Sequence, residues 1–182
     1  MKKQNLIENF DHRVSVYIQS YINNEKLSWW LSRINRGEVF LLVLVVLLSY
    51  FFSFQISKII LCMLFTGVFA FITDRLVLLI KKIISRKRPL LSVSGKEDKN
   101  PDMKHSFPSA HAANSMVVVV ILVLGFHLPG YFFLFPLFAG IGRLLSLHHY
   151  VSDVAGGWII GGGIGILAFQ IIQLEMFTSF LF

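Results

Sequence analysis

The chain has 182 residues, of which 55% are hydrophobic and 15% are charged, and its mean hydropathy is +0.67. These values exclude an ordinary soluble domain and indicate a single bundle of membrane helices. The formal net charge is +7, but the basic residues lie at the ends of apolar runs and no nucleic-acid-binding motif is present. The predicted anionic partner is therefore a phospholipid rather than a nucleic acid. Cys62 is the only cysteine, which excludes a disulfide within the chain and a thiolate metal cluster.

The N-terminal segment, residues 1–37, is mixed in polarity. Apolar residues recur there at steps of three and four positions, which predicts amphipathic helices. They are Leu6, Phe10, Val14, Tyr17 and Tyr21, followed by Leu27, Trp30, Leu31 and Ile34. Two interpretations stay open: helices that lie on the membrane surface, or a soluble cap that packs on the bundle. We divide the chain into N-terminal interfacial helices, 1–37, and a transmembrane bundle, 38–182.

Five apolar runs follow, and each can span about 30 Å of hydrocarbon, the first only with its flanking residues. They cover residues 39–54, 59–80, 109–126, 130–147 and 153–172. The predicted fold class is an all-α integral membrane bundle of about five transmembrane helices. With five crossings, the polar loop 81–108 and the stretch 143–153 emerge on the same side as the N-terminal segment. The last run carries Gly157, Gly161 and Gly165 four residues apart, a small-residue ridge that predicts close helix packing.

The first polar cluster, Lys81 to Pro89, is rich in cations. If the second helix continues through it, Lys81 and Arg88 are separated by about 700° of rotation and about 10.5 Å of rise, so they share one face. Two cations on one face can bind one phosphate or two adjacent ones. Asp74 lies seven residues before Lys81 and is predicted to orient it through a charge-assisted hydrogen bond. The alternative is that the basic run is only a juxtamembrane anchor.

The second cluster, Ser106 to His111, opens the third apolar run. Ser109 is well placed as a helix cap, and the free amides of the first helical turn would bind an anion with help from the helix dipole. His111 then projects beside that anion, where it can give a proton to a leaving oxygen as a general acid. A single histidine at a helix start is more often structural or solvated, so this cluster is weak evidence when taken alone.

The third cluster, Arg143 to Asp153, contains two adjacent histidines. His149 precedes Asp153 by four residues, which is one turn if the local backbone is helical. A carboxylate that accepts from one ring nitrogen fixes the tautomer and leaves the other nitrogen free to attack. Metal binding by His148, His149 and Asp153 is the competing interpretation. The neighbouring cations disfavour it, because they would repel a metal ion.

Three motifs follow one another between residues 81 and 153: Lys81 with six residues to Arg88-Pro89, then Pro108-Ser109-Ala110-His111, then Arg143 with five residues to His149 and three more to Asp153. Together they closely resemble the signature motifs of the type 2 phosphatidic acid phosphatases. Ala110 stands where that family often has glycine, and Gly142 where it often has serine. Both residues are small, so no catalytic group is lost. The residues before Lys81 lie outside the resemblance.

The resemblance implies a phosphatase that needs no metal and no cofactor. By position in the motifs, His149 attacks phosphorus, Asp153 orients His149, and His111 protonates the leaving group. The implied ligands of the phosphoryl oxygens are Lys81, Arg88, Ser109 and Arg143, with Pro108 and Ala110 in supporting positions. This division of roles agrees with the general expectation that phosphoryl transfer is catalysed by positioning and by charge stabilisation. Water then hydrolyses the phosphohistidine.

The expected substrate is a membrane lipid phosphate or diphosphate, whose headgroup enters the basic pocket while its chains stay in the bilayer. Bacterial members of the family suggest undecaprenyl diphosphate, phosphatidylglycerophosphate and lipid A 1-phosphate. A non-catalytic lipid-binding or transport protein is one alternative, disfavoured because binding alone does not require the pair of His149 and Asp153. A lipid phosphotransferase is another, which differs only in the acceptor. The oligomeric state is left open.

The expected location is the inner membrane of a bacterium, with several crossings. The positive-inside rule, applied to Lys82, Arg86, Lys87 and neighbouring lysines, would put the active site in the cytoplasm. Bacterial relatives usually face outward. We expect the outward orientation, because several of these charges can serve anionic headgroups rather than topology.

Overall fold

The computed structural model describes residues 6–21, 37–89, 105–145 and 148–174, and these ranges are helical apart from connecting turns and one isolated bridge between Lys87 and His105. The elements are α1 (Leu6–Tyr21), α3 (Gly37–Phe51), α4 (Ile56–Ile84), α7 (Ala110–Val120), the π-helical turn η1 (Ile121–Gly125), the 3₁₀ turn η2 (Gly130–Phe133), α8 (Leu134–Leu145) and α9 (Val151–Ile172). Each predicted apolar run thus contains a helix, which confirms the all-α prediction. The second amphipathic stretch, with Leu27 and Trp30, lies outside the described residues.

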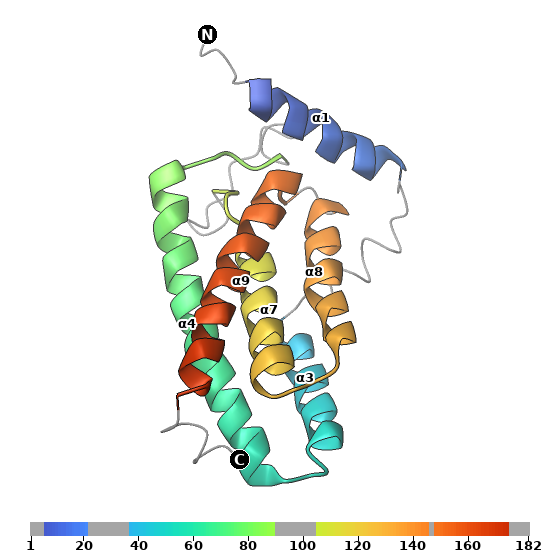
Figure 1. Ribbon diagram of the computed structural model, residues 1–182. Coiled ribbons are helices and arrows are strands. Elements are labelled where there is room, and N and C mark those ends of the chain that lie inside the picture. The colour runs from blue at the N-terminus through green and yellow to red at the C-terminus, as the bar shows by residue number, and fades with distance from the viewer. Residues whose placement is uncertain (1–5, 22–36, 90–104, 146–147, 175–182) are drawn as a thin grey trace.

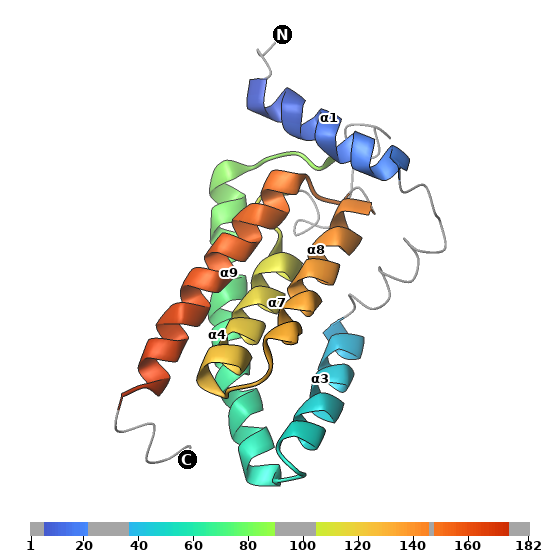
Figure 2. The ribbon, with the colours of Figure 1, turned by 45° about the vertical axis from the view of Figure 1, so that its right-hand side comes forward.

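Helix α7 is the centre of the bundle, and α4, α8 and α9 pack around it, while α3 pairs with the lower part of α4 (Figure 1). Helix α1 lies across one end of the bundle, and Figure 2 shows the same arrangement from a second direction. At this end α4 and α8 finish and α7 and α9 begin. The three polar clusters therefore lie at one end of the molecule.

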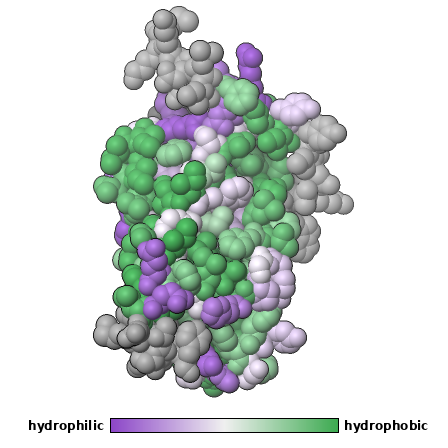
Figure 3. All heavy atoms as spheres, viewed as in Figure 1, coloured by the Kyte–Doolittle hydropathy of each residue, from purple (hydrophilic) through white to green (hydrophobic). Residues whose placement is uncertain are grey.

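The outside of the bundle is apolar. Helices α4 and α9 are long and hydrophobic enough to cross a membrane, with window hydropathies of 2.1 and 1.7, and only 17% and 28% of those windows are buried. Side chains such as Phe71 and Ile159 are 64% and 75% exposed, and Figure 3 shows apolar residues over much of the visible surface. Because these helices are hydrophobic yet face outward, they suit lipid rather than a soluble core. Helix α3, the segment α7–η1 and the segment η2–α8 are shorter apolar helices.

The predicted small-residue ridge brings α9 directly against α7. A Cβ atom at Gly157 would lie 2.5 Å from the carbonyl oxygen of Ser109, and one at Gly165 would lie 2.6 Å from Cβ of Val120. Gly161 faces the backbone of Ala113 in the same way. Since side chains larger than hydrogen do not fit at these positions, the ridge sets the distance between the two helices that begin at the candidate site.

Helix α4 does not continue through the basic run, so the predicted sharing of one helical face by Lys81 and Arg88 is wrong. The helix ends at Ile84, and Ser85 adopts a left-handed conformation, with φ of 51°, from which its N–H donates to the Lys81 carbonyl. A left-handed residue ends the helix and turns the chain. Arg88 therefore approaches from a non-helical segment.

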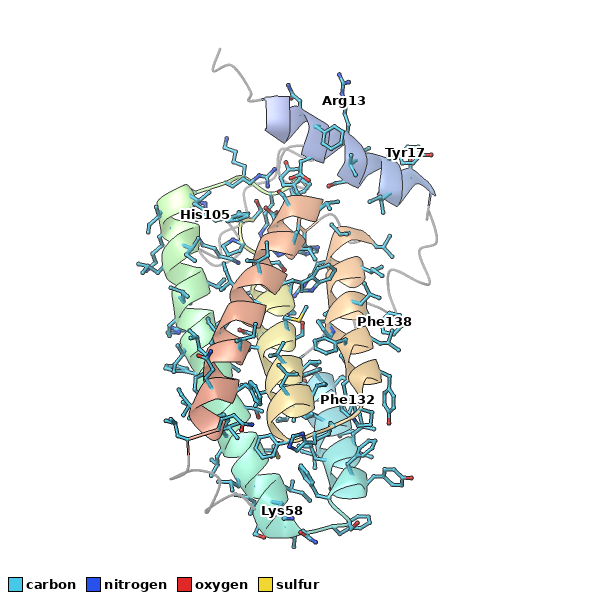
Figure 4. The ribbon with its side chains drawn as sticks, in the orientation of Figure 1. Arg13, Tyr17, Lys58, His105, Phe132 and Phe138 are labelled. Carbon is cyan, nitrogen blue, oxygen red and sulfur yellow. The ribbon has the colours of Figure 1, made fainter. Side chains whose placement is uncertain are left out.

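Helix α1 packs with its polar side toward the bundle. Asp11 and Ser15 are 6% and 0% exposed, whereas Phe10 and Tyr17 of the predicted apolar stripe are 70% and 66% exposed. Arg13 also points away from the bundle (Figure 4). Helix α1 therefore contacts the bundle through its polar face.

Candidate active site

His149 and Asp153 meet at the start of α9. His149 precedes the helix, Tyr150 is the N-cap residue, and Asp153 lies in the first turn. His149 Nδ1 lies 3.6 Å from Asp153 Oδ2, and the two residues are 2% and 0% exposed. The spacing of four residues brings the two groups together, although His149 itself is outside the helix. Because Nδ1 faces the carboxylate, Nε2 is the ring nitrogen left to face a substrate.

The carboxylate of Asp153 is held by groups from two other parts of the chain. Its Oδ2 accepts the backbone N–H of Tyr150 at 2.8 Å, and its Oδ1 accepts Nη1 of Arg86 at 2.8 Å. The Asp153 carbonyl accepts the backbone N–H of Ser109 at 2.9 Å. A fully buried carboxylate requires such partners, since an unpaired buried charge is strongly destabilising. These bonds fix Asp153 relative to the end of α4 and the start of α7.

Arg86 links Asp153 to the N-terminal helix. Its Nη2 donates to Asp11 Oδ2 at 2.7 Å, its Nη1 donates to Ser152 Oγ at 2.6 Å, and its guanidinium carbon lies 4.1 Å from the centre of the Tyr150 ring. Burial acts to lower the pKa of Arg86, but the carboxylates of Asp153 and Asp11 outweigh it and raise that pKa above the ordinary value. Arg86 is therefore a permanent cation between two buried carboxylates.

Helix α1 forms three more hydrogen bonds with the first turn of α9. The backbone N–H of Ser152 donates to Asp11 Oδ1 at 3.2 Å, and the Ser152 hydroxyl donates to Asp11 Oδ2. The backbone N–H of Val151 donates to Ser15 Oγ at 3.3 Å. The first turn of a helix has unpaired N–H groups, and here α1 supplies their acceptors. The N-terminal helix is thus part of the support of the site.

Two of the predicted phosphate ligands act on His149. Lys81, in the last turn of α4, and Arg88 are 6% and 5% exposed, and Arg88 Nη1 donates to the His148 carbonyl at 3.4 Å. Burial lowers the pKa of His149 to about 4; Asp153 opposes this shift, and the positive charges of Arg88 and Lys81 add to it. His149 is therefore a neutral imidazole at ordinary pH, the form that can act as a nucleophile.

His111 and Arg143 form the other side of the site. Arg143 Nη2 lies 2.7 Å from His111 Nδ1 and also contacts Nε2 of the same ring. Lys81 and Arg88 lie close enough to act electrostatically on His111 as well. The motif residues of α4, α7 and α8 therefore surround one region. A phosphate bound in this region would lie among these cations and beside the His111 ring.

Ser109 is the N-cap of α7, as predicted. Its Oγ accepts the backbone N–H of Ala112 at 3.5 Å, and Ser109 is fully buried. The preceding peptide bond, Phe107–Pro108, is cis. Ala110 is the first residue of the helix and lines a cavity together with His111. The helix therefore begins beside the two histidines, which is the placement that the anion-binding prediction requires.

Asp74 bonds to two neighbours on α4 and α7, and its orientation of Lys81 stays a prediction. In the described part of the chain its Oδ2 accepts Nη2 of Arg75 at 2.7 Å and its Oδ1 accepts Nδ2 of Asn114 at 3.5 Å. Asp74 also lines the cavity next to His111.

Sequence reasoning missed Arg86, Asp11 and Ser152. Arg86 lies inside the first motif, but it was counted only as a charge that reports membrane orientation. Asp11 lies on the polar side of α1, and Ser152 directly precedes Asp153. The signal in the sequence was an acidic residue of α1 in a chain with an excess of cations, and its partner Arg86 lies 75 positions away.

The competing interpretation of a metal site finds no support in the geometry. In residues 6–21, 37–89, 105–145 and 148–174, no group of three or more His, Cys, Asp or Glu side chains is arranged to hold a metal ion. Both oxygens of Asp153 already accept hydrogen bonds, one of them from the cation Arg86.

The described helices define a class of protein: a helical membrane bundle with a histidine and carboxylate pair beside several buried cations. The chain matches the model of the PAP2 superfamily over residues 38–177 and belongs to that family. This confirms the resemblance drawn from the three motifs. The match begins at α3, so α1 and the bonds it makes lie outside it.

The chain is similar to proteins of two kinds. The chain is 33% identical over 104 residues to decaprenylphosphoryl-5-phosphoribose phosphatase from two strains of Mycobacterium tuberculosis, an alignment that covers 57% of this chain. The chain thus spans 58% of the length of the curated relatives it matches. A crystal structure of a transmembrane PAP2 type phosphatidylglycerolphosphate phosphatase from Bacillus subtilis matches with a TM-score of 0.65 and 23% identity, over 95% of this chain and 90% of that one. The two proteins therefore share a fold.

Proposed function

We propose that the protein is a membrane phosphatase that removes a phosphate from a lipid phosphate or diphosphate through a phosphohistidine intermediate. The observation that carries the proposal is the buried, neutral His149, which lies 3.6 Å from the side-chain oxygen Oδ2 of Asp153 and among the cations Lys81 and Arg88. A neutral imidazole that is oriented by a carboxylate is a nucleophile, and surrounding cations attract a phosphoryl group.

The reaction proceeds in two steps. His149 Nε2 attacks phosphorus, a P–N bond forms, the bond from phosphorus to the leaving oxygen breaks, and His111 gives that oxygen its proton. Water then attacks the phosphohistidine, His111 accepts a proton from this water, the P–N bond breaks, and inorganic phosphate leaves. Lys81, Arg88 and Arg143 stabilise the charge on the phosphoryl oxygens, with Ser109 and the first amides of α7. No metal or cofactor takes part in these steps.

The names of the relatives support two of the candidate lipid substrates. Their names specify a decaprenylphosphoryl-5-phosphoribose and a phosphatidylglycerolphosphate, both of which carry a phosphorylated polyol on a lipid. Undecaprenyl diphosphate and lipid A 1-phosphate are the other candidates. Of these four, we place the two phosphorylated polyols first.

We further propose that five segments cross the inner membrane of a bacterium, with the site facing outward. Arg86 supports this orientation, because it is bound to Asp11 and Asp153 and so is not a free charge that holds a loop in the cytoplasm. A cysteine placed at position 99, which lies outside the described residues, should react with an impermeant reagent in intact cells. Reaction only after lysis would contradict the outward orientation.

The test is phosphate release by the detergent-purified protein, with chelator present, from a panel of the four lipids. We expect release by the wild type and none by His149→Ala. Phosphate release that is unchanged in His149→Ala would contradict the mechanism. Lipid binding without release by a folded wild type would instead favour the binding or transport alternative. Appearance of the phosphate on a second lipid or sugar, rather than free in solution, would favour the phosphotransferase.

A further inference from the structure

A cavity of about 600 Å³ lies between α3, α4, α7 and α8, next to His111. Most of its wall is apolar, with Leu44, Met63, Val118 and Phe138 among the lining residues. The polar side chains that line it include Asp74 and Asn114, together with His111, Ser115 and Thr66. Along the helices the wall therefore changes from polar, beside the proposed general acid, to apolar deeper in the bundle.

Asn114 presents an unpaired acceptor to this cavity. It follows His111 by three residues on α7, so both side chains lie on the same helical face. Its Nδ2 donates to Asp74 Oδ1 at 3.5 Å. This contact fixes the orientation of the amide, because its oxygen would repel the carboxylate. Asn114 Oδ1 is buried and accepts no hydrogen bond from any residue that the structure describes.

Asp74 is paired with its neighbour on α4. Arg75 pairs with it at 2.7 Å, and the guanidinium carbon of Arg75 lies 5.4 Å from the centre of the Phe71 ring. The polar part of the cavity thus offers two acceptors, the amide oxygen of Asn114, about one turn of α7 from His111, and the side-chain oxygens of Asp74 on α4. Buried acceptors without donors cost free energy, so this part of the cavity is suited to a group that donates hydrogen bonds.

We propose that Asp74 and Asn114 bind hydroxyl groups on the leaving group of the substrate. The substrate is then a phosphorylated polyol attached to a lipid, and not a phosphate joined directly to a hydrocarbon chain. The inference rests on the proposed function, in which His111 protonates the leaving oxygen and so places the leaving group at this cavity. Hydroxyls one or two carbons beyond the carbon that bears that oxygen bind Asn114, and the lipid chain continues along the apolar wall.

The test compares lipids that differ by one hydroxyl. The first pair is short-chain phosphatidylglycerophosphate and its analogue without the hydroxyl on the phosphorylated glycerol; the second is a polyprenylphosphoryl-5-phosphoribose and its 3-deoxy analogue. For the pair that the wild type hydrolyses faster, we expect kcat/KM to be about tenfold or more higher with the hydroxyl present, because a site built for a hydroxyl rejects the analogue that lacks it.

The variant Asn114→Leu, which is similar in volume, should bring this ratio close to one, and Asn114→Ala should do the same if leucine disturbs folding. Thr66→Val is the matched control. Thr66 lines the same cavity, but its hydroxyl already donates to the Cys62 carbonyl at 2.7 Å, so its loss should leave the ratio unchanged.

The outcomes separate the inference from the proposed function. Equal kcat/KM for the two members of a pair in the wild type, or an unchanged ratio in both Asn114 variants, overturns the hydroxyl site while the phosphatase stands. Faster hydrolysis of undecaprenyl diphosphate than of any polyol phosphate also overturns it. Failure of the folded wild type to release phosphate from any of these lipids contradicts the proposed function instead.

Discussion

The two sides of the candidate site are built in different ways. On the side of α1, Asp153 is fully buried, accepts two hydrogen bonds at 2.8 Å, and is connected through Arg86 to Asp11. On the side of the cavity, His111 is exposed and Asn114 keeps a buried oxygen without a donor. The side proposed to hold the nucleophile is fixed by buried charges, and the side proposed to meet the leaving group is open. Rigid positioning and substrate selection are therefore assigned to opposite sides.

The largest effect should come from Arg86→Gln. This change leaves Asp11 and Asp153 buried without their shared cation, so one of them takes up a proton or moves. We expect kcat to fall about 100-fold, because a small displacement of a catalytic pair has an effect of this order. The measurement is steady-state phosphate release, with Lys87→Gln as the exposed control in the same segment. Equal losses in both variants would contradict the special role of Arg86.

Gly157→Ala should disturb the contact that joins the two sides. The new methyl group would lie 2.5 Å from the Ser109 carbonyl, so α9 must move away from α7. We expect a loss of about 1–3 kcal/mol in stability, the usual effect of overpacking. Thermal unfolding in detergent measures it. Gly163→Ala is the control, because nothing lies within 4 Å of a Cβ atom at Gly163. Similar melting temperatures for the two variants would rule out the close approach.

Asp11→Asn tests whether the N-terminal helix supports the nucleophile. The amide can still bond to Ser152 but no longer neutralises Arg86. We expect about a tenfold decrease in kcat with little change in KM, a value in the range of one hydrogen bond to a charged group. Arg13→Gln is the control, since Arg13 is on the same helix and points away from the bundle (Figure 4). An unchanged kcat for Asp11→Asn would show that α1 only covers the site.

The smallest expected effect is on the pH dependence of kcat/KM. Burial lowers the pKa of His149 to about 4, so at pH 5 about nine-tenths of the imidazole is neutral, whereas at the ordinary value of 6.5 nearly all would be protonated. After correction for the second ionisation of the substrate phosphate, kcat/KM should stay level from pH 7 to about 5. If the corrected kcat/KM instead fell toward acid pH with a midpoint near 6.5, the result would contradict this prediction. The unfolded chain binds the proton first, so stability should decrease as pH falls from 6.5 toward 4.

The sequence allowed the helices and the motif residues to be predicted because both depend on local pattern. Long apolar runs with few charges form membrane helices, and Ser109 before an apolar run forms a cap. His149 and Asp153 were paired by their spacing alone. The membrane helices, the Ser109 cap and the His149–Asp153 pair all depend on positions close together in the chain.

The errors came from contacts between distant positions and from a single backbone conformation. The left-handed conformation of Ser85 ends α4 at Ile84. Because position 85 is neither proline nor glycine, the sequence did not predict this helix end. The bonds of Arg86 to Asp11 and of Asp74 to Asn114 join residues 75 and 40 positions apart, so no spacing rule finds them. The buried side of α1 is its polar side, which periodicity of apolar residues assigns to solvent.

The most direct test of the account is to find where the phosphate is held during turnover. The wild type is mixed with a lipid carrying a ³²P-labelled terminal phosphate, quenched in alkali, and digested, and the labelled peptide is sequenced. We predict label on His149, its loss in His149→Gln, and its retention in His148→Gln, the adjacent histidine that serves as the matched control. Label that persists in His149→Gln, or turnover without any labelled histidine, would contradict the proposed nucleophile.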